Sequence, residues 1–320
     1  MLGYELVEDI IVSANTDRVD FSNIAITEDD DLILVCEVVS GVVSIREILL
    51  YVNDDDVQSN YFRQSINAKS TVIASDRANY SSIGLVYPGK MCVLRANVKL
   101  TATGKLVALS QATVNAGSSD ILINNYGMAH SPSTSPIISL SVRTDVGVNA
   151  IGIGSRLQLY KRVAEVIADI TVASNTTKVD ISGLTIGKTN EYRLISDILA
   201  NDYINIGLHP NDDFSNNFYR QELNANGAVI SANRFNSTQI SYGFPNQRSF
   251  AISDIKLTNS GFFICISNGI YQYTLPSSMY LSKLYTTSTN AMTSINKLSI
   301  VAELSSGIKA GSRFQLIKLK

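Results

Sequence analysis

An internal repeat constrains the fold of this chain more than any other feature of its sequence. Residues 11–22 (IVSANTDRVDFS) align with residues 171–182 (TVASNTTKVDIS). Farther along, residues 60–64 (NYFRQ) match 217–221 (NFYRQ), and residues 154–161 (GSRLQLYK) match 311–318 (GSRFQLIK). Because the matches keep their order through both halves, they indicate a duplication. The 320 residues therefore divide into two copies, 1–161 and 162–320, each with the usual length of one domain.

Both copies have the sequence pattern of an all-β protein. Apolar residues alternate with polar or small ones in segments such as 203–209 (YINIGLH), which is the period of a half-buried strand. Asn-Gly at 226–227 predicts a hairpin with a type I′ turn. Short strands between frequent turns indicate a sandwich or barrel, and the length of each copy suits an eight-stranded jelly roll. We predict an all-β fold of two tandem β-sandwich (jelly-roll-like) domains, held in a fixed relation because no flexible linker joins them.

Charge and hydropathy exclude several classes of partner. The net charge is −2, and no basic stripe is visible, so we expect no nucleic acid partner. No apolar run reaches the ~20 residues that span a bilayer, so we expect no membrane insertion. The first residues lack the basic and apolar regions of a signal peptide. Three cysteines, at 36, 92 and 265, do not form a matched set, which favours buried thiols in a reducing cytoplasm.

Three short patterns occur once in each copy and together resemble a known family. They are Val19-Asp20-Phe21-Ser22, Asn53-Asp54 with Asn60-Tyr61, and Gly154-Ser155-Arg156-Leu157, repeated as Val179-Asp180-Ile181-Ser182, Asn211-Asp212 with Asn217-Phe218, and Gly311-Ser312-Arg313-Phe314. The arrangement resembles the β-sandwich virion proteins of tailed bacteriophages, which form tail, fibre and capsid-decorating components. The resemblance covers most of both halves. It implies a structural protein of the virion, made in the host cytoplasm, and it brings no active site with it.

The residues themselves suggest no catalytic chemistry. The two histidines, His130 and His209, have no nucleophile motif nearby, and the cysteines lack the spacing of a zinc site. We therefore predict no enzyme, no cofactor and no catalytic residue. The acidic turns contain weak candidates for calcium ligands, because Ca²⁺ prefers carboxylate oxygens: Asp54, Asp56, Asp212 and Asp213. The spacing of a calcium-binding loop is absent, and Asp and Asn favour turns on their own account, so we expect no metal site.

The repeated aromatic and arginine block supplies weak candidates for a binding or interface site: Tyr61, Arg63, Phe218, Tyr219 and Arg220. On a strand, one residue of each adjacent aromatic pair should face the core and the other should face outward. Core packing and ion pairs within a domain are the simpler explanations for these residues. The alternatives are contacts with neighbouring subunits, where Arg is enriched, and stacking against a sugar.

These observations lead to an expected function with two alternatives. We expect a non-enzymatic structural protein of a phage virion, in the tail, baseplate or fibre, which binds other virion proteins and forms homo-oligomers in the particle. A capsid decoration protein is the first alternative. A module that attaches to a glycan on the host surface is the second, and a cluster of exposed tyrosines at the tip of both domains would favour it.

Overall fold

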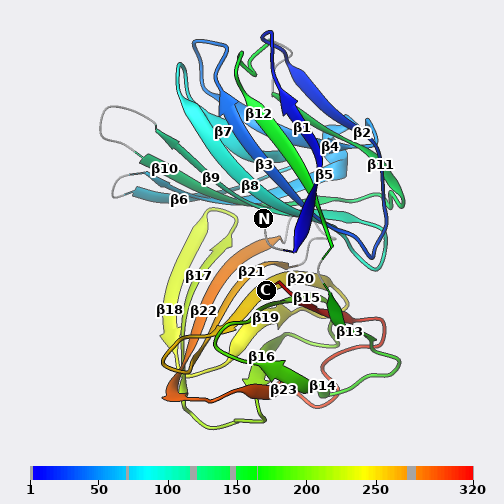
Figure 1. Ribbon diagram of the computed structural model, residues 1–320, viewed down its shortest axis with the longest axis vertical. Helices are drawn as coiled ribbons and strands as arrows, with labels where there is room; N and C mark the ends of the chain where they lie inside the picture. Colours follow the sequence, from blue (N-terminus) through cyan, green and yellow to red (C-terminus); the bar gives the residue numbers. More distant parts are fainter. Residues whose placement is uncertain are drawn as a thin grey trace.

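The computed structural model describes residues 3–69, 72–115, 121–144, 149–163, 165–271 and 279–319, and it consists almost entirely of strands (Figure 1). The described part of the first copy contains twelve strands and one 3₁₀ turn, η1 (Gln58–Asn60). The strands are β1 (Tyr4–Ile11), β2 (Arg18–Ile26), β3 (Asp31–Val39), β4 (Arg46–Val52), β5 (Tyr61–Lys69), β6 (Val72–Ala78), β7 (Ser82–Val86), β8 (Met91–Leu100), β9 (Leu106–Asn115), β10 (Ile121–His130), β11 (Ile137–Thr144) and β12 (Arg156–Arg162).

The second copy repeats this series in the same order. Its strands are β13 (Val166–Thr171), β14 (Lys178–Ile186), β15 (Glu191–Leu199), β16 (Ile204–Pro210), β17 (Phe218–Asn226), β18 (Val229–Phe235), β19 (Gln239–Gly243), β20 (Arg248–Leu257), β21 (Phe262–Tyr271), β22 (Tyr280–Ala291), β23 (Ile295–Ala302) and β24 (Arg313–Lys318). The last strand of the first copy ends at Arg162, one residue beyond the predicted boundary. In the described residues no helix is long and apolar enough to cross a membrane.

Each copy is a sandwich of a large and a small antiparallel sheet. In the first copy the large sheet has the order β1-β12-β3-β8-β9-β10-β5-β6 and the small sheet has the order β2-β11-β4-β7. Without β5, β6, β9 and β10, the remaining eight strands follow the order 1-8-3-6 and 2-7-4-5, which is a jelly roll. The all-β fold with two tandem sandwiches is therefore confirmed. The prediction of eight strands was too low, because two inserted strand pairs widen the large sheet.

Each sandwich has its own apolar core between its two sheets. Along β2, Val19 and Phe21 are buried while Asp20 and Ser22 are exposed, as the period-2 pattern predicts. The three cysteines are buried free thiols, Cys36 and Cys92 in the first core and Cys265 in the second. Burial in these apolar surroundings raises the pKa of each thiol. They therefore act as small core residues.

The repeated closing segment keeps its sequence because it ties three strands together. Ser155 Oγ accepts a hydrogen bond from the Val39 amide (2.9 Å) and donates one to the Gly152 carbonyl (2.7 Å). Its counterpart Ser312 accepts from the Leu199 amide at the same distance. The following arginines pair with the first strand of their own copy, Arg156 with Asp9 (2.5 Å) and Arg313 with Asp169 (2.5 Å). This motif is therefore structural in both copies.

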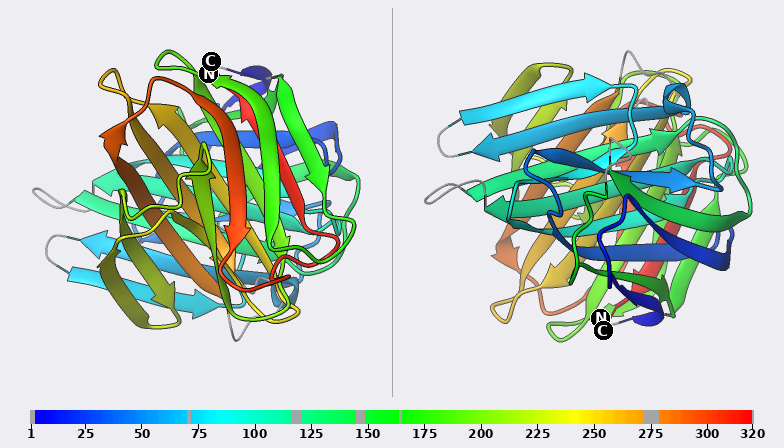
Figure 2. Two further views of the ribbon diagram at one scale, coloured as in Figure 1. Left: turned by 90° about the horizontal axis from the view of Figure 1, so that it is seen from below. Right: turned by 90° about the horizontal axis from the view of Figure 1, so that it is seen from above.

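The two large sheets pack against each other through their outer faces, so the molecule has four sheet layers (Figures 1 and 2). A third apolar cluster fills this contact. From the first copy it takes Phe62, Ile66, Val107, Leu109 and Ala129; from the second it takes mainly Ile195, Ala225, Phe250, Ile252, Ile270, Met279, Leu281 and Ile317. A buried apolar contact between domains favours a fixed arrangement, as the short junction predicts.

Candidate functional site

The aromatic residues predicted at an interface divide between the core and the surface. Tyr61 and Phe218 are buried inside their sandwiches, where the hydroxyl of Tyr61 donates a 2.6 Å hydrogen bond to the Asp55 carbonyl. Their neighbours Phe62 and Tyr219 face outward, as strand alternation predicts. Phe62 is buried because the second copy covers it, whereas Tyr219 is 55% exposed. Of the three predicted aromatic residues, only Tyr219 lies on the surface.

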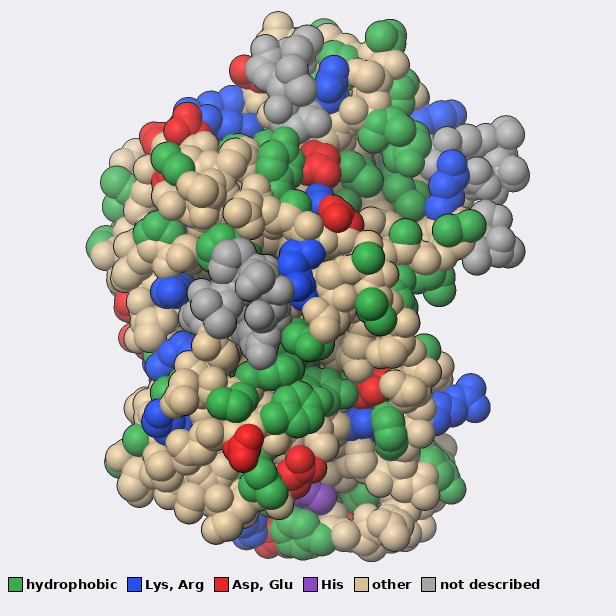
Figure 3. Space-filling model, turned by 180° about the vertical axis from the view of Figure 1, so that it is seen from behind, with side chains coloured by type: hydrophobic (Ala, Val, Ile, Leu, Met, Phe, Trp, Pro, Cys, Tyr) green, Lys and Arg blue, Asp and Glu red, His purple; other side chains and the backbone are tan. Residues whose placement is uncertain are grey.

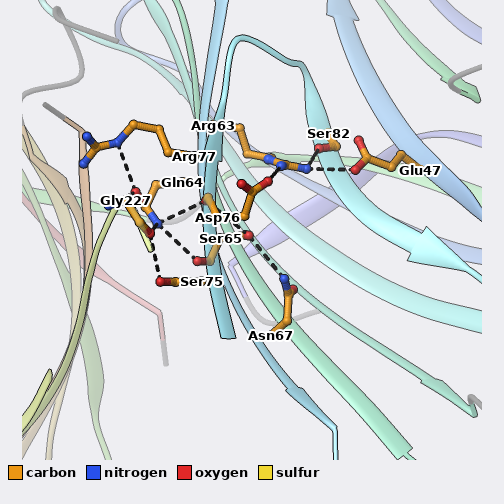
Figure 4. A network of polar contacts seen from close by, with 10 residues as sticks. All are labelled: Glu47, Arg63, Gln64, Ser65, Asn67, Ser75, Asp76, Arg77, Ser82 and Gly227. Carbon is orange, nitrogen blue, oxygen red and sulfur yellow. Dashed lines mark hydrogen bonds and ion pairs between the residues drawn. The ribbon is translucent and has the colours of Figure 1, made fainter. Parts of the chain in front are cut away.

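The two predicted arginines are buried in polar networks within their own copies. Arg63 Nη1 pairs with Glu47 (2.9 Å) and donates to Ser82 Oγ (2.8 Å), while Nη2 pairs with Asp76 (Figure 4). Its counterpart Arg220 pairs with Glu222 (3.1 Å). Most contacts of these two arginines are therefore ion pairs within their own domain, which was the simpler explanation.

The four weak calcium candidates lie on surface turns, and three of them contact cationic side chains. Asp212 contacts both Lys178 and Lys297 at 2.7 Å, and these bonds lower the pKa of its carboxyl group. Asp54 pairs with Arg18 and Arg143, and Asp56 lies 4.0 Å from Arg143. Asp213 accepts the Ser215 amide (3.0 Å). Across the residues that the structure describes, no group of three or more His, Cys, Asp or Glu could hold a metal ion.

Both Asn-Asp pairs adopt left-handed backbone conformations, with φ of 49° and 58° at Asn53 and Asp54 and 54° and 56° at Asn211 and Asp212. Asn and Asp tolerate this region better than other residues with a side chain. The side chain of Asn53 accepts the Ile138 amide (2.8 Å), and Asn211 accepts the Asn296 amide (2.9 Å). The acidic turns therefore have a structural reason for their sequence.

The β17–β18 hairpin docks on the face of β5 and β6 in the first copy (Figure 4). Gln64 Nε2 donates to the Gly227 carbonyl (3.0 Å), and Gln64 Oε1 accepts the Gly227 amide (2.9 Å). Ser75 Oγ donates to the same carbonyl (2.8 Å), and Arg77 reaches Asn226 Oδ1 (2.6 Å). The hairpin itself was predicted, but its turn was placed one residue too early. Asn226 pairs with Val229, so Gly227 is the first turn residue, and its φ of 59° with an ordinary residue next fits a type II′ turn.

This docking is not symmetric between the copies. Gln221 and Arg234 are the counterparts of Gln64 and Arg77, and both are exposed. Gly127 lets the second copy approach, because a Cβ at that position would lie 2.6 Å from Ile270 Cγ1. The register places Tyr285, which is exposed, at the corresponding position of the second copy. The outer faces of the two large sheets therefore differ. The hairpin of the second copy docks on the first copy, whereas the equivalent hairpin of the first copy does not dock on the second.

Asymmetric docking leaves one apolar row of the first copy uncovered. In the second copy the cross-strand row Ile230, Ala225, Leu281, Ile270 and Phe250 is largely buried against the first copy. The same register in the first copy gives Ile73, Ala68, Ile123, Thr113 and Val93, where the apolar side chains of β6, β10 and β8 remain exposed. Figures 1 and 2 show the ends of β6, β9 and β10 extending past β17 and β18. We call Ile73, Met91, Val93, Ile121 and Ile123 the overhang patch.

A cleft of about 540 Å³ opens between the large sheets beside the buried contact. Arg193 lies buried in its wall and pairs with Asp254 of its own copy (2.7 Å). From the same guanidinium, Nη1 donates to the Tyr4 hydroxyl (3.0 Å) and to Asn97 Oδ1 (3.2 Å) of the first copy. The charged wall of this cleft thus helps to hold the copies together.

The second copy has a groove between its two sheets that sequence reasoning did not identify. Two adjoining hollows of about 300 and 580 Å³ share Tyr203, Glu222 and Tyr242 in their walls. Further aromatic side chains line the groove: Phe244, Tyr271 and Tyr280 in one hollow and His209, Phe214 and Phe235 in the other. Figure 3 shows hydrophobic and acidic side chains next to each other on the surface of this copy.

Several aromatic rings of the groove are packed against one another. Tyr203 lies stacked on Tyr242 with centroids 6.3 Å apart, and it meets Phe244 edge-on at 5.1 Å. Tyr242 in turn meets Tyr271 edge-on at 5.3 Å. Contacts of this kind hold each ring in a fixed orientation. The groove therefore presents pre-formed aromatic surfaces, and Tyr203 is half exposed.

A buried carboxylate forms the polar part of the groove wall. Glu222 Oε2 accepts from the Tyr242 hydroxyl (2.6 Å) and contacts Arg220 Nη2 (3.1 Å), while Oε1 accepts from Asn233 (3.0 Å). Burial and the bond to Glu222 raise the pKa of Tyr242 to about 12, so its hydroxyl stays protonated. Within the part of the chain that the structure describes, Arg220 Nε and Nη1 and Asn224 Oδ1 make no hydrogen bond. Their counterparts in the first copy, Arg63 Nε and Asn67 Oδ1, are unpaired as well, so this feature belongs to the shared fold.

Comparison of the copies could have revealed this groove. Strand register places Leu85 opposite Glu47 where Tyr242 lies opposite Asn205. In the same way, Val114 and Leu122 of the first copy correspond to Tyr271 and Tyr280 of the second. The tyrosines are therefore additions specific to the second copy, since the fold forms with aliphatic residues at the same places.

Comparisons with known proteins give no family for this chain. No family model matches it, and no curated protein matches it. Among solved structures, the mouse laminin alpha1 chain, domains LG4-5, aligns over 99% of this chain and 90% of its own, with 9% identity and a TM-score of 0.19. The di-domain ARO/CYC StfQ from the steffimycin biosynthetic pathway aligns over 62% and 66%, with 8% identity and a TM-score of 0.10. Structural similarities this weak give no information about function.

Proposed function

We propose that this chain is a non-enzymatic structural protein of a phage particle, in its tail, baseplate or fibre, and that it assembles by packing sheet faces together. The overhang patch is the observation that supports assembly most directly. It gathers five exposed apolar side chains on three strands of one sheet face, and clusters of exposed apolar side chains often mark contacts with other proteins. The placement in a phage particle rests on the resemblance of the repeated strand patterns.

A second copy of the chain is the partner that the overhang patch fits best. The equivalent row in the second copy is already buried on a large-sheet face of this same protein. Sheet-on-sheet packing of such rows is therefore a contact that this sequence is able to make. We therefore propose homo-oligomers in the particle, with other virion proteins as further neighbours.

Labelling of purified phage particles tests this proposed function. An antibody against the recombinant chain, carrying gold, should label the tail or fibres in the electron microscope. Label over the head would favour capsid decoration in place of a tail component. Absence of label from every particle would contradict a role in the virion.

Attachment to a glycan on the host surface is a second candidate function, and the groove of the second copy favours it. Tyrosines cluster in this groove of the second copy, although the expectation was a cluster in both domains, and polar side chains lie beside them. A particle protein with such a groove could combine assembly through the first copy with binding through the second.

A further inference from the structure

We propose that the groove of the second copy is a binding site for an uncharged oligosaccharide. The proposal concerns the ligand of this groove and does not depend on the overhang patch. Three properties of the groove support it: the aromatic surfaces, the polar side chains in its walls, and the balance of charge.

The aromatic surfaces suit the faces of sugar rings. One face of a pyranose ring presents C–H groups, which pack on an aromatic ring, while its hydroxyl groups point outward. Tyr203 and Tyr242 lie stacked at 29° to each other, and Tyr203 is exposed enough to contact a ligand. Tyr280 lines the same hollow from β22. Pockets that combine aromatic walls with a few polar groups are the usual form of a small-molecule site.

The polar atoms of the groove suit hydroxyl groups, which both donate and accept hydrogen bonds. Asn205, Asn224 and Asn226 lie in the walls of the groove together with Glu222 and Glu303. A ligand with hydroxyl groups could donate hydrogen bonds to the carboxylates and accept them from the amide nitrogens. An apolar ligand would remove these groups from water without replacing their hydrogen bonds, which costs free energy.

Arg220, in the groove wall, lacks two acidic partners that its counterpart Arg63 has in the first copy. Arg63 pairs with Glu47 and Asp76, and these positions are Asn205 and Asn233 in the second copy. Glu222 replaces Ser65 and provides one new carboxylate. The second copy thus exchanges two acidic partners for one and gains a cluster of tyrosines. A purely structural ion pair does not require this exchange, because the first copy folds without it.

The charges that line the groove favour an uncharged ligand. Arg220 is compensated by Glu222, and Glu303 adds a further carboxylate beside Asn205 (2.7 Å). His209 adds no compensating charge at neutral pH, since burial lowers its pKa below the usual value. With carboxylates in excess, an acidic sugar would be repelled. We therefore assign the site to neutral sugars.

The two copies provide matched variants to test this assignment. In Tyr203→Ile and Tyr242→Leu, each tyrosine is replaced by the residue found at the equivalent place in the first copy, Ile45 and Leu85. Leu85→Tyr is the converse change and serves as the control in the first copy. Circular dichroism and thermal unfolding of each full-length variant establish that it folds.

Binding is measured by glycan array and then by saturation-transfer difference NMR of the full-length protein. The array carries neutral hexose and N-acetylhexosamine oligosaccharides together with sialylated ones. We expect binding to a subset of the neutral glycans, and a dissociation constant three- to tenfold higher for Tyr203→Ile, in line with the loss of one stacked ring. Leu85→Tyr should bind as the wild type does.

Three results would overturn the proposal. They are binding to no neutral glycan on the array, binding restricted to sialylated glycans, and binding that both tyrosine variants leave unchanged. None of these results bears on assembly, since the overhang patch lies on the other copy. Failure of the saccharide site and failure of the structural role can therefore be told apart.

Discussion

At the scale of single residues, Lys99 carries a charge that the fold opposes. Its side chain is buried, and Nζ donates to the Asp30 carbonyl (2.8 Å). Burial lowers its pKa from 10.5 to about 8, although Asp31 opposes the shift. Between these two values the unfolded chain binds a proton that the folded chain has released, so stability should rise with pH.

Replacement of Lys99 tests this linkage. From pH 8 to pH 10.5 we expect the wild type to gain up to about 3 kcal/mol in its free energy of unfolding relative to Lys99→Met, because the variant has no amine to titrate. Urea unfolding at a series of pH values measures the difference. If the difference in the free energy of unfolding between the wild type and Lys99→Met stays constant across this range, Lys99 does not titrate in this way.

Position 127 requires glycine because the second copy packs closely against it. A Cβ at this position would lie 2.6 Å from Ile270 Cγ1 and 3.1 Å from Leu281 Cδ1 of the other copy. We expect Gly127→Val to lower the free energy of unfolding by about 1–3 kcal/mol through overpacking. The matched control is Tyr285→Ala at the exposed counterpart, which should change it by less than about 0.5 kcal/mol. Equal effects of the two variants in denaturant unfolding would contradict the docking.

At the scale of elements, the docking of one hairpin depends on Gln64. This side chain makes two hydrogen bonds with the backbone of Gly227 in the other copy. Gln64→Ala leaves the Gly227 amide without a partner and its carbonyl with only the bond from Ser75, so we expect a loss of about 1–3 kcal/mol in the free energy of unfolding. Gln221→Ala, the same change at an exposed site, should cost less than about 0.5 kcal/mol. Thermal unfolding of both variants measures the contrast, and similar melting temperatures would speak against the hairpin contact.

Strand-level features were predictable where they depend on local pattern. The repeat predicted two copies, and alternation predicted that one residue of each adjacent aromatic pair faces inward and the other outward; Tyr61 and Phe218 are the inward ones. Alternation cannot say which outward residue is covered by another domain, because that depends on how two sheet faces dock. For this reason the burial of Phe62 and the exposure of Tyr219 could not be foreseen.

The groove escaped prediction for a similar reason. Tyr203 lies just before β16, Tyr242 lies on β19 and Tyr280 lies on β22, and only the sandwich brings them together. The sequence alone contains one usable signal, which is the substitution of aliphatic residues of the first copy by tyrosines in the second. A duplication is recognised from the positions at which the two copies agree. The tyrosines stand at positions where the copies differ, so they are noticed only when those positions are compared as well.

At the scale of the whole molecule, the two copies present different surfaces and are joined through a buried apolar contact. The first copy provides the overhang patch, and the second provides the groove. A rigid connection through the large sheets would keep these two surfaces at a constant spacing. Such an arrangement suits a component that is fixed in an assembly at one end and binds at the other.

Self-association of the full chain tests the central claim of assembly most directly. Sedimentation velocity over a range of protein concentrations should show oligomers for the wild type and a monomer for the double variant Ile73→Lys/Ile123→Lys. These side chains are 54% and 40% exposed, so the variant should keep its fold, as circular dichroism can verify. Val43→Lys, at an exposed site outside the patch, should associate as the wild type does. A wild-type chain that stays monomeric at every concentration, or oligomers that persist in the double variant, would contradict assembly through the overhang patch.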